Sequence, residues 1–136
     1  MTDTSGAERD DRPQLLLVDD DVTFCSVLAR ALETRGFRVR VAHSVAEALG
    51  GIRDEAPEYA VIDLKMPDRS GLTLVSELMA LDGQTRIVVL TGYASIATAV
   101  EAIKLGAVYY LSKPADADDI VTAFHRESGD RSAPVS

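Results

Sequence analysis

Five short apolar or alternating segments are separated along this chain by segments whose apolar residues recur every three or four positions. The five short segments are 15–18, 38–41, 59–62, 87–90 and 108–111. Short apolar runs bounded by polar residues are typical of strands, and a spacing of three or four is typical of amphipathic helices. The pattern therefore predicts five strands, each followed by a helix.

The helical spacing covers residues 22–35, 44–53, 70–81, 95–105 and 116–125. Residues that favour helix ends support these bounds. Ser44 and Glu47 form the pattern of a capping box, Asp116 is a preferred N-cap residue, and Gly36 stands where the first helix should end. In that first helix the spacing predicts an inward face of Phe24, Val27, Leu28, Ala31 and Leu32.

The composition of the strands predicts their order in a sheet. Segments 15–18, 59–62 and 87–90 are almost wholly apolar, which is typical of parallel strands buried on both faces. Segment 38–41 alternates arginine with valine and should lie at an edge. Right-handed crossovers then favour a doubly wound (βα)5 fold of the flavodoxin-like type, in the order 2-1-3-4-5, with a switch point between strands one and three.

Polar side chains follow four of the predicted strands at their C-terminal ends. Asp19 and Asp20 follow the first, Asp63 the third, Thr91 the fourth and Lys113 the fifth. Because parallel strands end at the same edge of a sheet, these side chains should surround one site. Each has a simpler explanation when taken alone, as a turn residue, a cap or a solvated lysine. Their combination indicates phosphoryl transfer onto an aspartate.

Three carboxylates brought together repel one another, and a bound cation removes that cost. An oxygen-only site suits Mg2+, which we therefore expect as the cofactor. The side chains of Asp20 and Asp63 are the expected ligands, with Asp19 acting through water and the main-chain carbonyl of Lys65 adding one oxygen. The proline after Lys113 favours a cis Lys113–Pro114 bond that would aim the ammonium at Asp63.

Composition narrows the remaining classes. The 136 residues are 46% hydrophobic and suit one compact domain, and a net charge of -8 argues against nucleic-acid binding by this segment. No apolar stretch approaches the roughly 20 residues of a membrane span. The single cysteine, Cys25, excludes an internal disulfide, fits a reducing cytoplasm and has no positive neighbour to activate it. We expect a disordered tail over 1–13, a domain over 14–125 and a linker over 126–136.

Taken together, these residues resemble the receiver domain of two-component response regulators, over roughly residues 14–124. The resemblance implies that Asp63 is the phosphoacceptor and that Asp19 and Asp20 form an acidic Mg2+ pair. It also implies that Lys113 binds the phosphoryl group. The loop after the acceptor matches at Met66–Pro67 and Gly71, and the resemblance makes Thr91 a switch hydroxyl and Tyr110 a switching aromatic ring.

The stretches LLLVDDD and LTGYASIATAVEAIKLGAVYYLSKPADADDI are similar to the redox-responsive RegA/PrrA/ActR regulators, as is the turn Arg35-Gly36-Phe37. This resemblance implies a C-terminal Fis-type DNA-binding domain beyond a proline-containing linker, and Pro134 stands in such a segment. DNA would then be bound only through a domain absent from this chain, and redox sensing would belong to the partner kinase. The alternative is a stand-alone single-domain receiver or a phosphorelay intermediate.

The family's reaction implies a sensor histidine kinase as partner and no membrane contact. The chain would act as a phosphoacceptor that catalyses its own phosphorylation and dephosphorylation, with Lys65 and Tyr93 flanking the path of the hydrolytic water. The switch would alter the surface of 95–105, 108–111 and 116–125 and promote a homodimer. Small residues at Ala97, Thr98 and Ala102 suit a dimer contact; otherwise the helix only packs on the sheet through Ile96, Val100 and Ile103.

Three other functions fit the sequence less well. An aspartyl-phosphate hydrolase would have a carboxylate two residues after the nucleophile, where Lys65 stands. A flavin-binding electron carrier would need a Ser/Thr/Gly-rich phosphate loop after the first strand, where this chain has three aspartates. A degenerate receiver that works without phosphate would not keep the complete set of site residues.

Overall fold

The computed structural model describes residues 11–92 and 96–126, in which strands and helices alternate along the chain. The strands are β2 (Gln14–Val18), β3 (Arg38–Ala42), β4 (Tyr59–Asp63), β5 (Arg86–Thr91) and β6 (Tyr109–Ser112). The helices are α2 (Val22–Thr34), α3 (Val45–Ile52), α4 (Gly71–Leu81), α5 (Ile96–Leu105) and α6 (Ala117–Phe124). None of the helices in this described part combines the length and the apolar composition that crossing a bilayer requires.

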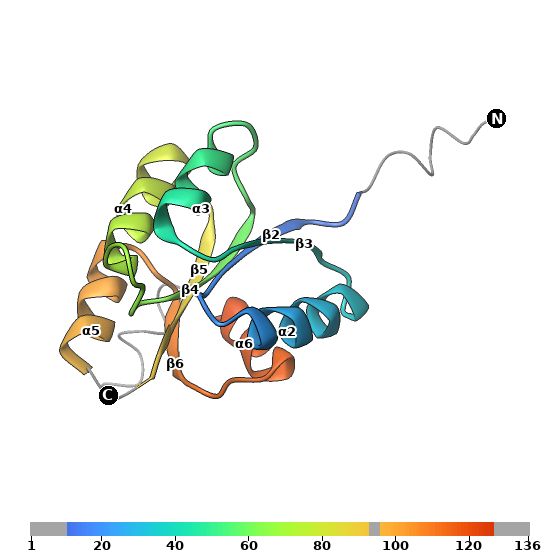
Figure 1. The fold of residues 1–136 in the computed structure, drawn as a ribbon. Helices are drawn as coiled ribbons and strands as arrows, with labels where there is room; N and C mark the ends of the chain where they lie inside the picture. The colour runs from blue at the N-terminus through green and yellow to red at the C-terminus, as the bar shows by residue number, and fades with distance from the viewer. Residues whose placement is uncertain (1–10, 93–95, 127–136) are drawn as a thin grey trace.

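The five strands are parallel and form one sheet in the order β3-β2-β4-β5-β6 (Figure 1). This confirms the predicted 2-1-3-4-5 order. After β2 the chain forms β3 at one edge and then returns to place β4 on the other side of β2. The carboxyl ends of β2 and β4 are therefore neighbours, at the position where doubly wound sheets bind ligands.

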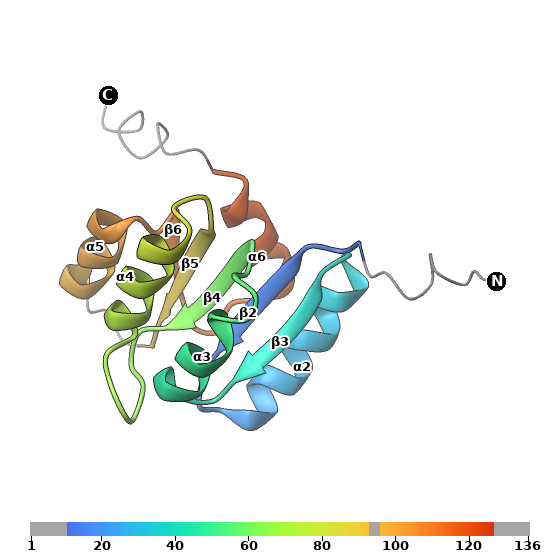
Figure 2. The ribbon, with the colours of Figure 1, turned by 90° about the horizontal axis from the view of Figure 1, so that it is seen from above.

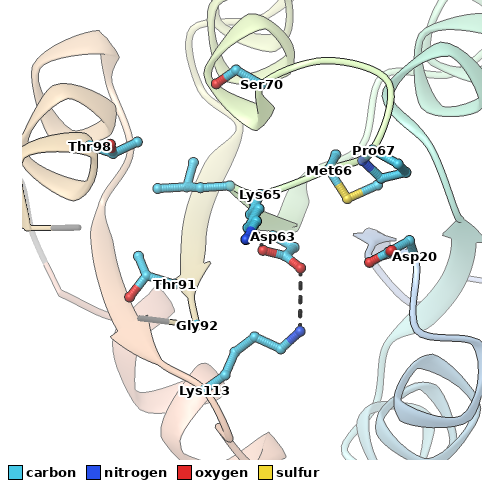
Figure 3. A pocket seen from close by; sticks show the side chains of 11 residues that line it. Asp20, Asp63, Lys65, Met66, Pro67, Ser70, Thr91, Gly92, Thr98 and Lys113 are labelled. Atoms are coloured by element: carbon cyan, nitrogen blue, oxygen red, sulfur yellow. Dashed lines mark hydrogen bonds and ion pairs between the residues drawn. The ribbon is translucent and has the colours of Figure 1, made fainter. Parts of the chain in front are cut away.

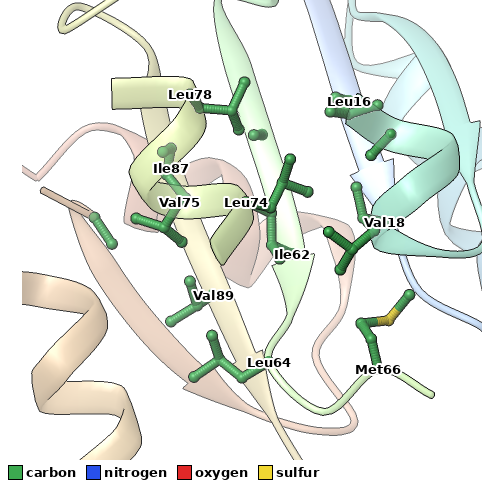
Figure 4. Close-up of a cluster of buried hydrophobic side chains, with 14 of the residues drawn as sticks. Leu16, Val18, Ile62, Leu64, Met66, Leu74, Val75, Leu78, Ile87 and Val89 are labelled. Atoms are coloured by element: carbon green, nitrogen blue, oxygen red, sulfur yellow. The ribbon is translucent and has the colours of Figure 1, made fainter. Parts of the chain in front are cut away.

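Helices cover both faces of the sheet: α3, α4 and α5 lie on one face, and α2 and α6 on the other (Figure 2). Successive side chains of each strand enter opposite layers. In β2, Leu16 and Val18 join the hydrophobic cluster beneath α3 and α4 (Figure 4), whereas Leu15 and Leu17 join the cluster beneath α2 and α6. Burial on both faces explains why this strand is wholly apolar.

The strand β3 differs because it lies at the edge of the sheet, as its alternating sequence predicts. Four of its five residues are only partly buried. Arg38 pairs with Glu55 at 2.9 Å, and the Arg40 Nη1 donates to the carbonyl of Gly51 at 3.1 Å. The arginines of this strand therefore bind the segment around the end of α3 and do not enter the core.

Side-chain caps fix where the helices begin. The Ser44 hydroxyl accepts a hydrogen bond from the Glu47 N–H at 3.0 Å, and Asp116 accepts one from the Asp119 N–H at 2.8 Å, as the sequence predicts. The Glu47 carboxylate accepts in return from the N–H of His43. These bonds satisfy amide groups that have no partner inside the helix.

The inward face of α2 is rotated from the predicted one. Val27 is 67% exposed, and Cys25 is buried together with Leu28 and Leu32. The apolar residues of this helix extend over more than one face, so spacing alone admitted two neighbouring assignments. Burial of Cys25 against the core of the sheet corrects the prediction.

The helix α5 also differs from its predicted packing. Ile96 is 54% exposed and Val100 is 43% exposed, whereas Ala99 and Ala102 are completely buried. The proposed packing through Ile96 and Val100 is therefore wrong, and Ala102 is not part of an outer surface. The apolar residues of α5 occur on several of its faces, and its buried alanines allow the helix backbone to lie close to the sheet.

Candidate functional site

One cavity lies at the carboxyl edge of the sheet and gathers most of the predicted site residues. It has a volume of about 810 Å³. Strand ends and the loops after them supply its walls, and Figure 3 shows the side chains converging from β4, β5, β6 and the segment after β2. The lining residues are Asp20, Asp63, Leu64, Lys65, Met66, Pro67, Ser70, Thr91, Gly92, Thr98 and Lys113.

Three carboxylates meet at this edge. One oxygen from each of Asp19, Asp20 and Asp63 lies within 4.8 Å of the others. Asp19 is completely buried and Asp63 nearly so, whereas Asp20 is exposed. Oxygen donors that converge in this way suit a hard divalent cation, so these three residues can hold a metal ion.

Asp63 carries the electrostatic cost of this arrangement. Burial raises its pKa above the ordinary value, and the negative charge of Asp19 raises it further. The N–H of Lys65, which donates to Asp63 Oδ1 at 3.0 Å, acts in the opposite direction, as does the Lys113 ammonium. The net direction of the pKa shift is upward because burial is the largest contribution.

Lys113 bridges the two buried carboxylates. Its Nζ lies 2.9 Å from Asp19 Oδ2 and 3.3 Å from Asp63 Oδ2 (Figure 3 marks the second contact). Burial acts to lower the pKa of Lys113, but the hydrogen bonds and charges of the two aspartates outweigh it and the pKa is raised. The Lys113–Pro114 bond is cis, and the Lys113 N–H donates to the Thr91 carbonyl.

The carboxylate and the main-chain carbonyl of Asp19 both have hydrogen-bond partners in the protein. Its Oδ1 accepts from the Asp21 N–H at 2.9 Å, and its Oδ2 accepts from Lys113. Its main-chain carbonyl lies 2.9 Å from His43 Nδ1 and accepts from the Cys25 thiol at 3.2 Å. Both carboxylate oxygens of Asp19 are thus engaged by protein donors, while Asp20 lines the cavity.

The loop after β4 passes close beneath the site. The Gly71 N–H donates to the Leu64 carbonyl, and Lys65 pairs with Ser70 in an isolated β-bridge. A Cβ added at Gly71 would lie 2.6 Å from the carbonyl oxygen of Asp63, so only glycine fits there. This close approach fixes the loop that carries Met66 and Pro67 along the cavity wall.

The predicted switch and tuning residues have different placements. Thr91 is buried at the end of β5 and lines the cavity. Tyr110 does not line it; this half-buried residue packs against the cluster beneath α3 and α4, with its ring centroid 5.5 Å from that of Tyr109. Lys65 lines the cavity, and Tyr93 lies outside the described residues.

Sequence reasoning missed three residues near the site. Phe24 was assigned only to a helix face, yet its ring lies 4.9 Å from the Lys113 Nζ. His43 is not among the predicted site residues, yet its Nδ1 lies 2.9 Å from the Asp19 carbonyl. Asp68 accepts from the N–H groups of Val45 and Ala46, and so attaches the loop after β4 to the start of α3. Nothing in the spacing of these residues indicates the contacts.

Comparison with protein families gives one match. The sequence model of the response regulator receiver domain matches residues 15–125, which is nearly all of the described chain. This range contains every predicted site residue. The match therefore agrees with the fold and with the position of the cavity.

Among curated proteins, the chain is similar to the bacterial regulatory proteins ActR and RegA. The chain is 52% identical over 120 residues to the acid tolerance regulatory protein ActR of Rhizobium meliloti (strain 1021), covering 88% of this chain and 62% of ActR. It is 50% identical over 123 residues to the photosynthetic apparatus regulatory protein RegA of Rhodobacter capsulatus, covering 90% of this chain and 67% of RegA. The chain thus spans less than two thirds of the length of ActR.

Solved structures agree. A response regulator protein from Burkholderia pseudomallei, crystallised with a phosphorylated aspartic acid, a calcium ion and citrate, matches with a TM-score of 0.82 and 44% identity, over 91% of this chain and 73% of that one. A CheY-like receiver domain from Methanospirillum hungatei matches with a TM-score of 0.80 and 27% identity, over 91% and 99%. The chain belongs to the response regulator receiver domain family.

Proposed function

We propose that this chain is a phosphoacceptor in a two-component system, in which Asp63 receives a phosphoryl group from a sensor histidine kinase. The observation that carries the proposal is the meeting of Asp19, Asp20 and Asp63 with the Lys113 ammonium in one cavity. The phosphorylated aspartic acid named for the Burkholderia pseudomallei protein supports it. The chain is then a signalling module and not an enzyme that turns over a separate substrate.

The transfer joins a carboxylate oxygen of Asp63 to phosphorus while the phosphorus–nitrogen bond of the kinase phosphohistidine breaks, and the imidazole nitrogen keeps the electron pair. Such reactions depend mainly on positioning and charge neutralisation. Lys113, 3.3 Å from Asp63 Oδ2, offsets negative charge on the phosphoryl oxygens. Thr91 lines the same cavity and donates its hydroxyl to one of them.

Mg2+ is the cation that we propose for the acidic cluster. Asp20 and Asp63 serve as side-chain ligands and Lys65 contributes its main-chain carbonyl. Asp19 acts through water, because both of its carboxylate oxygens already accept hydrogen bonds from protein donors. When bound, Mg2+ neutralises charge on the carboxylates and the phosphoryl oxygens. The calcium ion named for the Burkholderia pseudomallei protein supports a divalent cation here.

Phosphorylation then biases a two-state element. The Thr91 hydroxyl moves toward the phosphoryl oxygen, and Tyr110 turns into the space beside it. This changes the surface of α5, β6 and α6, on which a second copy of the chain docks. Exposed Ile96 and Val100 on α5 supply apolar area for that contact.

In the complete protein we propose that this switch controls transcription through a C-terminal Fis-type DNA-binding domain, in response to a redox signal sensed by the kinase. The 52% identity to ActR and the 50% identity to RegA, both regulatory proteins by name, support this reading. Lys65 and Tyr93 tune the hydrolysis of the acyl phosphate. Replacing Tyr93 with alanine is expected to accelerate Mg2+-dependent dephosphorylation, because more water reaches the phosphoryl group.

Incubation with acetyl phosphate and Mg2+, followed by intact mass, tests the assignment of Asp63. We expect a gain of one phosphoryl group per chain, lost with EDTA and absent in Asp63→Asn. The matched control is Asp54→Asn, the same chemical change at an exposed position outside the cavity. Uptake by Asp63→Asn equal to that of the control would contradict the proposal.

A further inference from the structure

The Lys113 ammonium has a third neighbour besides its two carboxylates. Its Nζ lies over the ring of Phe24, 4.9 Å from the centroid. The three contacts come from separate parts of the chain: Asp19 follows β2, Asp63 ends β4 and Phe24 lies in the first turn of α2. The side chain of Lys113 remains 23% exposed, so the ring covers part of an otherwise open ammonium site.

The position of Phe24 is fixed by the same loop that carries the acidic residues. The Phe24 N–H donates to Asp21 Oδ1 at 3.0 Å, and the Asp21 N–H donates to Asp19 Oδ1 at 2.9 Å. The ring is also partly buried against the cluster beneath α2 and α6. Hydrogen bonds therefore connect the Phe24 main chain through Asp21 to Asp19, and both the Phe24 ring and Asp19 contact the Lys113 ammonium.

Such a contact has a clear physical effect on a lysine. The ammonium stands on a flexible four-carbon stem with many rotamers. The face of an aromatic ring carries negative quadrupole charge and attracts a cation within about 6 Å of its centroid. A ring at this position narrows the directions that the ammonium can take to those that face Asp19 and Asp63.

We propose that Phe24 is a positioning residue of the phosphotransfer site: its ring face holds the Lys113 ammonium where it meets the phosphoryl group bound for Asp63. The inference rests on the proposed function and adds to it a residue outside the strand-end positions. Leucine at this position fills most of the same volume without a ring, and tyrosine keeps the ring. Comparing Phe24→Leu with Phe24→Tyr therefore separates the effect of the aromatic ring from the effect of side-chain packing.

The contact is tested first in the unphosphorylated, metal-free protein. The chain has three lysines, Lys65, Lys104 and Lys113, so lysine labelled with 13C at the ε-methylene gives three resonances, two of them internal controls. A ring current from Phe24 shifts the Lys113 ε-methylene protons upfield. We expect that shift in the wild type and in Phe24→Tyr, and its loss in Phe24→Leu with Lys65 and Lys104 unchanged. Identical Lys113 shifts in the wild type and Phe24→Leu would overturn the proposal.

The functional arm measures the rate of phosphoryl uptake from acetyl phosphate, a donor too small to depend on kinase docking. We expect Phe24→Leu to slow uptake about three- to tenfold, the effect of losing one partly desolvated cation–ring contact, and Phe24→Tyr to stay within about twofold of the wild type. Urea unfolding of each variant confirms that it is folded. Normal uptake by Phe24→Leu would overturn this proposal alone, whereas a wild type that takes up no phosphoryl group would overturn the proposed function as well.

Discussion

The two ends of the sheet handle polar and charged groups in opposite ways. At the carboxyl end, buried Asp19 and Asp63 share one ammonium, and the pKa of Asp63 is raised. At the amino end, three aromatic rings pack against one another. Phe37 and Tyr59 meet edge-to-face at 5.1 Å between centroids, and Tyr59 lies 4.7 Å from Phe124.

Two cations at the amino end, Arg86 and Arg126, contact neutral groups rather than carboxylates. Arg86, at the start of β5, donates to the carbonyls of Phe124 at 2.5 Å and Arg126 at 2.6 Å. The Arg126 guanidinium lies 4.0 Å from the centroid of the Tyr109 ring. A positive charge at the C-terminal end of α6 is favourable for the helix dipole.

Groups that favour the folded state and groups of the proposed site thus lie at opposite ends of the strands. The amino end contains packing and charge placement that favour the folded state. The carboxyl end keeps carboxylates together at a cost that a cation can offset. Substitutions at the amino end should therefore lower stability and leave metal binding unchanged. Removal of a carboxylate charge at the carboxyl end should instead raise the stability of the metal-free protein and weaken metal binding.

The largest expected effect on stability is at the amino end. Replacing the fully buried Phe124 with alanine should cost about 3–5 kcal/mol, because it removes a large side chain from the aromatic cluster and leaves a cavity. Urea unfolding measures this cost. The matched control is Val27→Ala, at a position 67% exposed, which should change stability by less than about 0.5 kcal/mol. Equal losses of stability in the two variants would contradict a stabilising role for the aromatic cluster at the amino end.

A smaller cost is expected for Arg86→Met. The variant keeps most of the side-chain length but loses two charge-assisted hydrogen bonds to carbonyls at the end of α6, which should cost about 2 kcal/mol. Urea unfolding checks it against Arg30→Met, a substitution on the exposed face of α2. Mg2+ affinity should be the same in both. A change in affinity in Arg86→Met would mean that the two ends are coupled.

At the carboxyl end the sign should reverse. Because the pKa of Asp63 is raised in the folded state, its ionised form destabilises the metal-free protein at neutral pH. Asp63→Asn in EDTA should thus unfold at higher urea concentration than the wild type at pH 7. The advantage should shrink as the pH falls through the raised folded-state pKa and vanish below 3.8, the ordinary aspartate value, because the wild-type carboxyl is then protonated in both states. Equal stability at pH 7 would contradict the cost assigned to Asp63.

The smallest effect concerns Cys25, beneath the acidic loop. Burial, with the negative charges of Asp19 and Asp21, raises its pKa to about 12. At pH 8 the folded protein should therefore react with iodoacetamide far more slowly than the urea-unfolded chain, because thiolate is the reactive form. Rapid modification of the folded protein would show that this region opens readily.

Much of the fold could be predicted because the strands differ in character. Apolar β2 and β5 indicated burial on both faces, and Arg38 and Arg40 indicated an edge. Chain connectivity then left one common order of strands. The inward faces of α2 and α5 could not be predicted. Each helix has apolar residues on more than one face, so the spacing of these residues does not select the buried face.

The convergence of Asp20, Asp63 and Thr91 was predictable for a simple reason. Parallel strands present their C-terminal ends at one edge, so a position in the sequence implies a position in space. Phe24 over Lys113 and His43 against Asp19 are contacts between side chains from separate elements. They depend on rotamers and loop geometry, which no residue pattern encodes.

If a divalent cation completes the acidic site at the carboxyl end, Mg2+ must stabilise the folded protein. Thermal unfolding with increasing MgCl2, at ionic strength matched with NaCl, measures this stabilisation. The wild type and Asp54→Asn should gain about 2.7 kcal/mol at a Mg2+ concentration 100 times the dissociation constant, whereas Asp20→Asn and Asp63→Asn should gain far less. A wild type whose unfolding midpoint is unchanged by Mg2+, or variants that respond equally, would contradict the account.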